Sequence, residues 1–174
     1  MADVLTHVLA GYIIGSVLAL SVDRIKTAHV TVVMVGAVVP DLAKIDLVLS
    51  ETTVAATLGI PWNWTALHTL GGSIVMAGLC ALVVDRRHRL LVFGLFLVGA
   101  LSHHVLDLLL LTWDGRAYPV LWPLTGYRPP SGGLYMSSDR WPLLLATTIG
   151  TILWLCRRRF DASMSTDPID RRDN

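Results

Sequence analysis

Ionisable side chains stand inside an apolar run that is long enough to cross a bilayer. Residues 90–111 are apolar apart from a short polar stretch that contains His103, His104 and Asp107. A spanning helix needs about 20 predominantly apolar residues, and this run meets that requirement. Because ionisable groups are costly inside a bilayer, they need a partner or a function there. The run therefore predicts a membrane helix that carries a functional polar site.

Four further apolar windows cover much of the chain, and hydrophobic residues make up 53% of its 174 residues. The five windows are 4–22, 28–39, 66–84, 90–111 and 141–156. We expect an all-α fold, a polytopic membrane bundle of about five transmembrane helices. Residues 1–160 would form one membrane-embedded domain, and the polar residues 161–174 would form a disordered cytoplasmic tail.

The second window is short, because about twelve residues rise only about 18 Å against about 30 Å for the hydrocarbon core. Pro40 is expected to break the helix where the window ends. Either Asp41 then lies below the membrane surface, or the helix is tilted and continues beyond the window.

Clusters of Lys and Arg follow the first, third and fifth windows, and such clusters favour the cytoplasmic side of a membrane. They comprise Arg24, Lys26, Arg86, Arg87, Arg89 and Arg157 to Arg159. We therefore expect a multi-pass protein of the plasma or inner membrane, with its N-terminus outside and its C-terminus in the cytoplasm. The net charge of +1 provides no basic face, so no nucleic-acid partner is expected. Membrane lipids are the expected partners, and no protein partner is indicated.

Polar residues within the apolar segments fall toward one membrane face in this topology. They are His7, Asp41, His68, His103 and Asp107. His103 and Asp107 are spaced i, i+4 and share a helix face, so both could bind one ion, or the carboxylate could orient the imidazole. His104 points about 100° away from His103 and either supports Asp107 or packs at another interface.

Imidazole and carboxylate groups without thiolates form the ligand set of Zn²⁺ or Mn²⁺ in hydrolytic sites. We expect a divalent metal ion, with Zn²⁺ favoured over Mn²⁺, and His7, Asp41, His68, His103 and Asp107 as its ligands. The alternative for each residue is an interhelical hydrogen bond.

Five short motifs resemble those of the membrane-bound, metal-dependent hydrolase family that includes the LexA-regulated inner-membrane hydrolases. The similarity runs from about residue 5 to 125, with the motifs in the family's order. They are Thr6-His7, Val39-Pro40-Asp41 followed by Asp46, Leu67-His68-Thr69, Ser102-His103-x-x-x-Asp107 and Leu121-Trp122-Pro123-Leu124.

This resemblance implies a membrane enzyme with a divalent-metal site. The pattern is also similar to that of zinc-dependent phospholipase C enzymes, which favours a phosphoester or lipid substrate. Asn63 stands where family members often have a histidine, so the site would have one ligand fewer. Water or Asp46 would then complete the coordination shell of the metal, or the chain has lost the metal site and keeps only the family fold.

A metal-dependent hydrolase is the function that the sequence favours, with Asp107 and Asp46 as candidate catalytic residues. Arg116, just after the 90–111 run, is the candidate for binding an anionic substrate group, although an ordinary exposed arginine is the alternative. Two other functions stay open: a small transporter or proton or cation path that uses the same residues, and a non-catalytic membrane scaffold.

Overall fold

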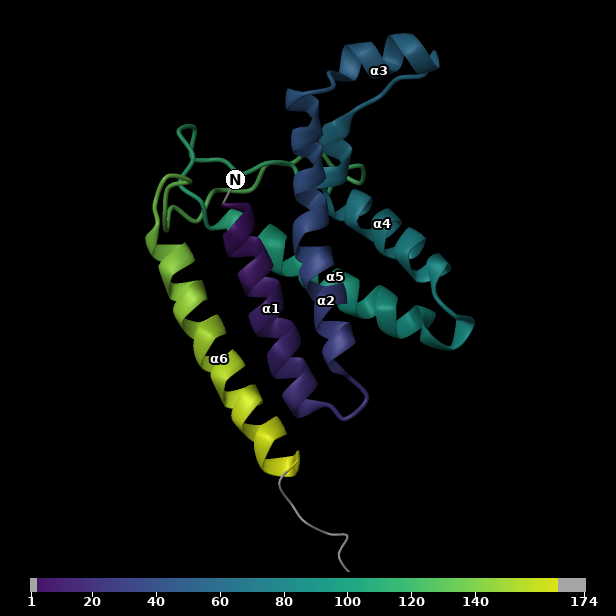
Figure 1. Ribbon diagram of the computed structural model, residues 1–174. Coiled ribbons are helices and arrows are strands. Elements are labelled where there is room, and N and C mark those ends of the chain that lie inside the picture. Colours follow the sequence, from purple (N-terminus) through teal and green to yellow (C-terminus); the bar gives the residue numbers. More distant parts are fainter. Residues whose placement is uncertain (1–2, 166–174) are drawn as a thin grey trace, which may run out of the picture.

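The computed structural model describes residues 3–165, and these residues form helices and loops without a β-strand. The expectation of an all-α fold is therefore confirmed for this part of the chain. Figure 1 shows the arrangement of the elements. In chain order they are α1 (Val4–Ser21), α2 (Thr27–Val38), η1 (Val39–Leu47), α3 (Glu51–Leu58), η2 (Trp64–His68), α4 (Leu70–Val83), η3 (Arg86–His88), α5 (Arg89–Leu108) and α6 (Trp141–Ser165), where η denotes a 3-10 helix.

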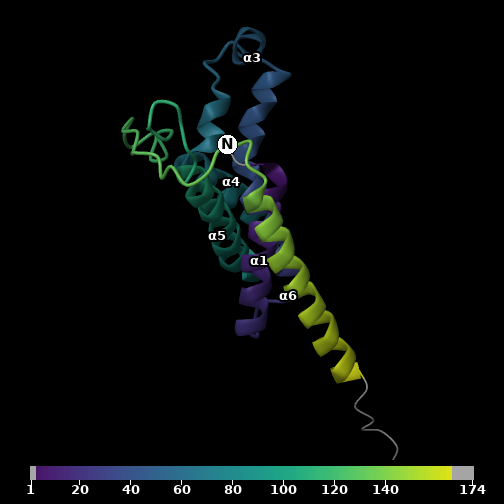
Figure 2. The same cartoon turned by 90° about the vertical axis from the view of Figure 1, so that its left-hand side faces the viewer.

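Helix α2 occupies the centre of the bundle. It packs against α1 on one side and α5 on the other, while α4 packs on α5 and α6 packs on α1. Figures 1 and 2 show α6 running along α1 and ending at the same end of the molecule as the α1–α2 turn. Arg157 joins these three helices, because its guanidinium donates to Ser16 Oγ at 3.2 Å and to Thr27 Oγ1 at 3.0 Å.

Two glycines allow the backbones of α2 and α5 to approach closely. A Cβ atom at Gly36 would overlap the carbonyl oxygen of Phe96, and a Cβ atom at Gly99 would overlap the carbonyl oxygen of Val33. Small residues permit this close contact between membrane helices, where dispersion forces between backbones replace the hydrophobic effect. The contact fixes α5, which carries His103, His104 and Asp107, against α2.

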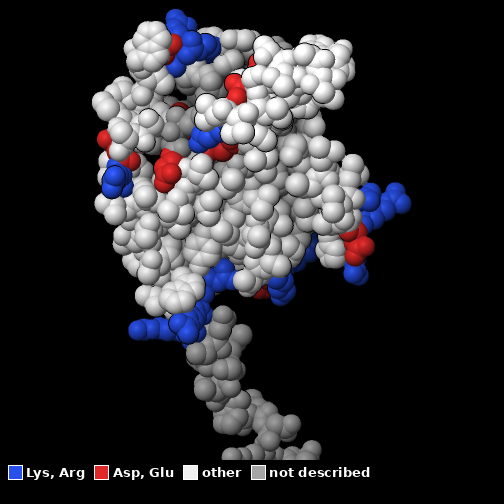
Figure 3. Space-filling model, turned by 45° about the horizontal axis from the view of Figure 1, so that its top comes forward, with Lys and Arg blue, Asp and Glu red and all other residues white. Residues whose placement is uncertain are grey.

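The distribution of side chains is that of a protein in an apolar solvent. Large apolar side chains such as Leu20, Val75 and Leu82 are exposed, whereas His7, Ser73 and His103 are fully buried. Figure 3 shows a broad area without charged side chains between charged groups at the two ends of the visible face. Lipid tails can cover such an area, while buried polar groups need partners inside the bundle.

Within residues 3–165, two helical segments are long and apolar enough to cross a membrane, Val4–Ser21 and Arg86–Leu108. Helix α2, with 12 residues, and α4, with 14 residues, are shorter than the roughly 20 residues of an independent span. Of the expected bundle of about five spans, the structure confirms the all-α fold and supports two of the spans by length and composition. Five crossings and the expected orientation stay predictions.

Pro40 ends the α-helical hydrogen bonding of α2 without ending the helical column. The chain continues directly into η1, which keeps Pro40 and Asp41 buried, and Figure 1 shows α2 and η1 as one rising column. Of the two expectations for the short second window, the structure shows the continued helix.

Helix α3 lies in a region for which the sequence analysis predicted no element. Ser50 caps its first turn by accepting a hydrogen bond from Thr53 N, and Gly59 ends it with φ at 67°, in the left-handed region that glycine favours. Helix α6 also extends beyond the expected window to Ser165. The remainder of the expected cytoplasmic tail, residues 166–174, lies outside the described residues.

Candidate metal centre

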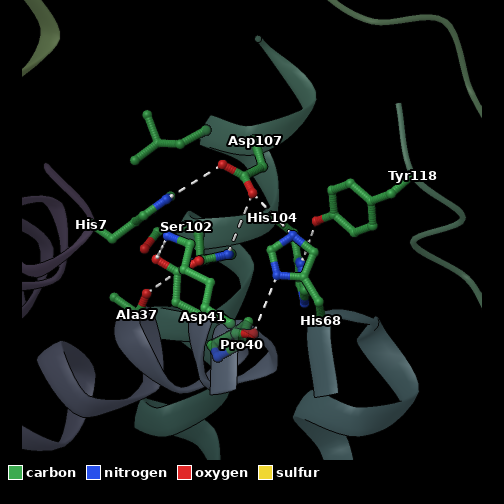
Figure 4. A network of polar contacts seen from close by, with 12 residues as sticks. His7, Ala37, Pro40, Asp41, His68, Ser102, His104, Asp107 and Tyr118 are labelled. Carbon is green, nitrogen blue, oxygen red and sulfur yellow. Dashed lines mark hydrogen bonds and ion pairs between the residues drawn. The ribbon is translucent and has the colours of Figure 1, made fainter. Parts of the chain in front are cut away.

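Three imidazoles from three elements converge on the carboxylate of Asp107. His68 Nε2 lies 3.0 Å from Asp107 Oδ2, His103 Nε2 lies 3.6 Å from the same oxygen, and His7 Nε2 lies 3.4 Å from Asp107 Oδ1. Figure 4 shows His7 and His68 reaching Asp107 from different sides. The first turns of α1, the end of η2 and the last turns of α5 therefore share one buried polar site.

Backbone carbonyls hold two of these rings by their other nitrogen. His103 Nδ1 lies 2.8 Å from the carbonyl oxygen of Ala37, and His68 Nδ1 lies 3.2 Å from that of Pro40. A carbonyl oxygen can only accept, so each Nδ1 donates its proton. A hydrogen bond of this kind on the far nitrogen is the usual way in which proteins orient a metal-binding histidine.

The sequence at the end of α2 explains why the carbonyl of Ala37 is available to His103. In a 3-10 helix this oxygen would accept from the N–H of the residue three positions later, which is Pro40 and has no N–H. The imidazole of His103 supplies the missing donor. The Pro40 break is thus part of the site.

Because Nδ1 carries the proton in both His68 and His103, Nε2 of each ring has a lone pair. Each lone pair faces an oxygen of Asp107, which is also an acceptor when ionised. Acceptors cannot stabilise one another at these distances unless a positive charge lies among them. A proton or a metal cation satisfies this requirement.

His7 adds a third ring whose nitrogens have no hydrogen bond within the described residues. The ring is fully buried and stacks on His103 with the centroids 3.9 Å apart. An unsatisfied buried polar group costs about 1–3 kcal/mol. A cation among these nitrogens would remove part of that cost.

Asp41 brings a second carboxylate to the same region. Lys44 Nζ donates to Asp41 Oδ2 at 2.8 Å, while Asp41 Oδ1 is buried without a hydrogen bond among the described residues. Two groups of three residues each place one ligand atom per residue within 4.8 Å of the others in the group, and both groups include His103. One group adds His7 and Asp107, and the other adds Asp41 and His68.

A pocket of about 370 Å³ reaches His68 from the side of η1 and η2. Its lining includes Lys44, Asp46 and Thr65. His7 and His103 are completely enclosed, whereas His68 lines the pocket. A molecule from outside would therefore reach the cluster at His68.

His104 belongs to a separate buried network beside the cluster. Its Nε2 lies 2.8 Å from Ser73 Oγ on α4, and its Nδ1 lies 2.7 Å from the hydroxyl of Tyr118. Tyr118 also packs against His68 with the ring centroids 4.4 Å apart. Burial, followed by the negative charges of Asp107 and Asp41, raises the pKa of Tyr118 far above its usual value, so the hydroxyl stays protonated.

The structure brings together the five residues that the sequence predicted as ligands. His7, Asp41, His68, His103 and Asp107 all lie in this cluster, and their role as metal ligands stays a prediction. One position differs from expectation, because His68 ends η2 instead of opening the third long helix.

The structure does not bring Asp46 or Arg116 into the cluster. Asp46 is exposed, and its Oδ1 accepts from the backbone N–H of Glu51 at 3.0 Å, although it does line the pocket beside His68. Arg116 is exposed on the turn after α5, where its backbone N–H donates to Asp114. Asn63, which replaces a family histidine, is exposed before η2.

Sequence reasoning missed Lys44 and Tyr118 as neighbours of the site. The i, i+3 spacing of Asp41 and Lys44 is compatible with an ion pair on a helix, but the sequence analysis assigned Lys44 no role at the site. No local pattern marks Tyr118, because its position depends on how the 109–140 loop folds back, with Ala117 N donating to Pro129 O.

The comparisons with known proteins bear on the family. No curated protein and no solved structure matches the chain. A family model described as "YdjM inner membrane protein" matches residues 1–165. This match covers both candidate spans and all five clustered residues. The chain therefore belongs to the YdjM inner membrane protein family.

Proposed function

We propose that this chain is a membrane-bound hydrolase that uses a divalent metal ion, with Zn²⁺ favoured over Mn²⁺. The observation that carries the proposal is the arrangement around Asp107. Three imidazole nitrogens face one buried carboxylate, and two of the rings are fixed by carbonyls so that their lone pairs point toward it.

The donor set fits such an ion by its chemistry and by its unsatisfied atoms. His7, Asp41, His68, His103 and Asp107 would hold one or two cations through imidazole nitrogens and carboxylate oxygens. A divalent cation bound among such ligands makes water more acidic and polarises an ester oxygen.

The protein's own residues would bind and orient the substrate. Lys44, with a partly exposed ammonium group at the pocket, would attract an anionic group, and Asp46 on the pocket wall would accept a proton from water. Asp107 would hold the three imidazoles in place. These roles favour a phosphoester as the substrate.

The depth of the site favours a substrate in the membrane. His7 lies about 5 Å along α1 from its first residue, and His103 lies about 8 Å from the end of α5. The site is therefore near the end of both candidate spans, where lipid headgroups lie. A lipid or lipid-linked phosphoester can reach this depth without leaving the bilayer.

A proton or cation path is the second candidate, because a proton could also lie between an imidazole and Asp107. A path requires polar groups across the whole membrane. Among the described residues, the buried polar side chains lie at the site end of the bundle, apart from Ser16. This clustering supports a site over a path.

Elemental analysis of the purified protein tests the metal site. We expect zinc or manganese in stoichiometric amount, and its loss in His68→Ala and in His103→Ala. His88→Ala, at an exposed position, and His104→Ala, in the neighbouring buried network, are matched controls that should keep the metal. A wild-type protein that takes up no metal from excess ion would refute the metal site and favour the proton path or a scaffold.

Hydrolysis is tested separately with bis(p-nitrophenyl) phosphate and with phospholipid vesicles. We expect activity in the metal-loaded protein and none in the two variants that lose the metal. A protein that binds metal and hydrolyses neither class of probe would leave the metal site intact and make the scaffold the better description.

A further inference from the structure

A second cavity lies at the opposite end of the two candidate spans from the His and Asp cluster. It has a volume of about 820 Å³, within the range of about 300–1,000 Å³ that is typical of ligand pockets. The α1–α2 turn forms one wall, and the start of α5 forms the other. The two walls are distant in sequence, so the fold creates the cavity.

Cationic groups from both walls line this cavity. Arg24 and Lys26 come from the turn and Arg87 comes from η3, and no carboxylate belongs to the lining. Asp85 lies 3.7 Å from Arg87, but both side chains are about three-quarters exposed, and such pairs contribute little. The cavity thus has an excess of positive charge.

His29 adds a hydrogen-bond donor with a defined orientation. The backbone N–H of Lys26 donates to His29 Nδ1 at 2.8 Å, so the proton of the neutral ring is on Nε2. His29 therefore offers an N–H group together with the guanidinium and ammonium groups. Such donors are suited to the oxygens of a phosphate.

Apolar side chains form the rest of the lining. Val22, Ile25, Leu90 and Leu91 lie beside the cationic groups, and the side chain of Leu90 is 87% exposed. A free phosphate ion would leave this apolar surface in water. A phospholipid covers it with the acyl chains that adjoin its headgroup.

The ends of the spans place the cavity at headgroup depth. One candidate span ends at Ser21, and the other begins at Arg86, both next to lining residues. Basic pockets between membrane helices at this depth bind the headgroups of anionic lipids. We propose that the cavity binds the headgroup of an anionic phospholipid. This site is separate from the proposed hydrolytic function and does not depend on it.

Native mass spectrometry of the full chain tests the proposal. The protein would be released from detergent micelles that contain equal amounts of phosphatidylglycerol and phosphatidylcholine, with EDTA present so that no metal-dependent hydrolysis can consume the lipid. We expect phosphatidylglycerol to be retained in preference to phosphatidylcholine. The double variant Arg24→Gln/Arg87→Gln should weaken phosphatidylglycerol binding about 30-fold, from about 1 kcal/mol for each basic residue near the surface.

A control variant with the same loss of charge separates this cavity from general surface charge. Arg86→Gln/Arg159→Gln removes two exposed arginines at the same end of the molecule that do not line the cavity. It should retain the preference for phosphatidylglycerol. Equal losses in both double variants, or no loss in Arg24→Gln/Arg87→Gln, would overturn the proposal.

A competition experiment identifies the source of the phosphate group. Inorganic phosphate at millimolar concentration should leave the phosphatidylglycerol adduct in place, because it gains nothing from the apolar lining. Displacement of the lipid by inorganic phosphate would show a site for the free ion and would overturn the assignment to a lipid.

Discussion

His68 Nε2 lies 3.0 Å from Asp107 Oδ2, although the whole of α4 separates these two residues in the chain. This is the shortest of the three contacts between an imidazole and Asp107. His68 ends a 3-10 helix outside the long helices, while Asp107 is in the last turns of α5. The site therefore depends on the packing of η2 against the bundle as much as on α5.

Asp107→Asn should remove the metal while preserving the fold. Asparagine has nearly the same size but no negative charge, and it places an amide group where the imidazole lone pairs need a cation. We expect elemental analysis to find metal in the wild type and in Asp46→Asn but little in Asp107→Asn. Asp46→Asn should instead lose hydrolysis with its metal retained. Equal metal contents in Asp107→Asn and the wild type would contradict the central role of Asp107.

The convergence of the polar residues could be predicted from the sequence. Ionisable groups in apolar helices are costly in contact with lipid, so they are expected inside the bundle, next to one another. His7, Asp41, His68, His103 and Asp107 were expected to lie close together, and the structure brings them into one cluster. The hydrogen bonds that fix the rings could not be predicted, since they depend on backbone carbonyls near the Pro40 break.

The short elements were less predictable than the long ones. Helix α3 has a capping serine and a terminating glycine, Ser50 and Gly59, and these signals could have located it. Its eight residues have no buried side chain, so the apolar pattern that revealed the long helices was missing. Tyr118 lies beside His68 through a fold of the 109–140 loop that no periodicity encodes.

Pro40→Ala should weaken metal binding, even though residue 40 contributes no ligand atom from its side chain. The new N–H at position 40 would compete for the carbonyl of Ala37, which orients His103. Loss of such an orienting hydrogen bond typically costs about 10-fold to 100-fold in metal affinity. Zinc titration measures the effect, and Pro61→Ala, at an exposed loop position, is the control. Equal affinities in the two variants would show that the carbonyl contact is unimportant.

Lys44→Gln should raise KM for an anionic phosphoester by about 10-fold to 150-fold, because a hydrogen bond from a charged group is worth about 1.5–3 kcal/mol. Lys44 lines the pocket next to His68, whereas Arg116 is exposed on a turn outside it. Arg116→Gln should therefore leave KM unchanged. Since Lys44 also contacts Asp41, metal content is measured in both variants. The opposite ranking of the two KM values would restore Arg116 as the substrate-binding residue.

Tyr118→Phe should lower the Tm at neutral pH, and the Tm of the variant should fall less than that of the wild type at alkaline pH. It leaves His104 Nδ1 without its 2.7 Å partner, which costs about 1–3 kcal/mol. Burial raises the pKa of Tyr118 above the ordinary value of 10.0, so above pH 10 the unfolded chain loses this proton before the folded protein does. The unfolded state then binds fewer protons, and stability falls as pH rises.

Comparing the Tm of the wild type and of Tyr118→Phe at pH 9 and pH 11 separates the ionisation of Tyr118 from that of the other tyrosines. Burial, with the charge of Asp107, also raises the pKa of Tyr135 to about 12, and this residue remains in both proteins. The wild type should therefore lose more Tm between the two pH values than Tyr118→Phe does. Identical losses would show that Tyr118 ionises equally in the folded and unfolded states.

Gly99→Ala should separate α2 from α5 and disturb the site through packing alone. A methyl group at residue 99 would overlap the carbonyl oxygen of Val33, and overpacking of this kind costs about 1–3 kcal/mol. Gly94→Ala on the same helix is the matched control, since a Cβ there meets no atom within 4 Å. Its higher helix propensity should leave Tm equal or slightly raised.

The same pair of glycine variants tests whether the site depends on the contact between the two helices. His103 and its partner carbonyl at Ala37 lie on opposite sides of this contact, so Gly99→Ala should weaken zinc binding as well as lower Tm. Gly94→Ala should bind zinc as the wild type does. If Gly99→Ala kept full zinc affinity despite a lower Tm, the histidines would be held independently of the close approach of α2 and α5.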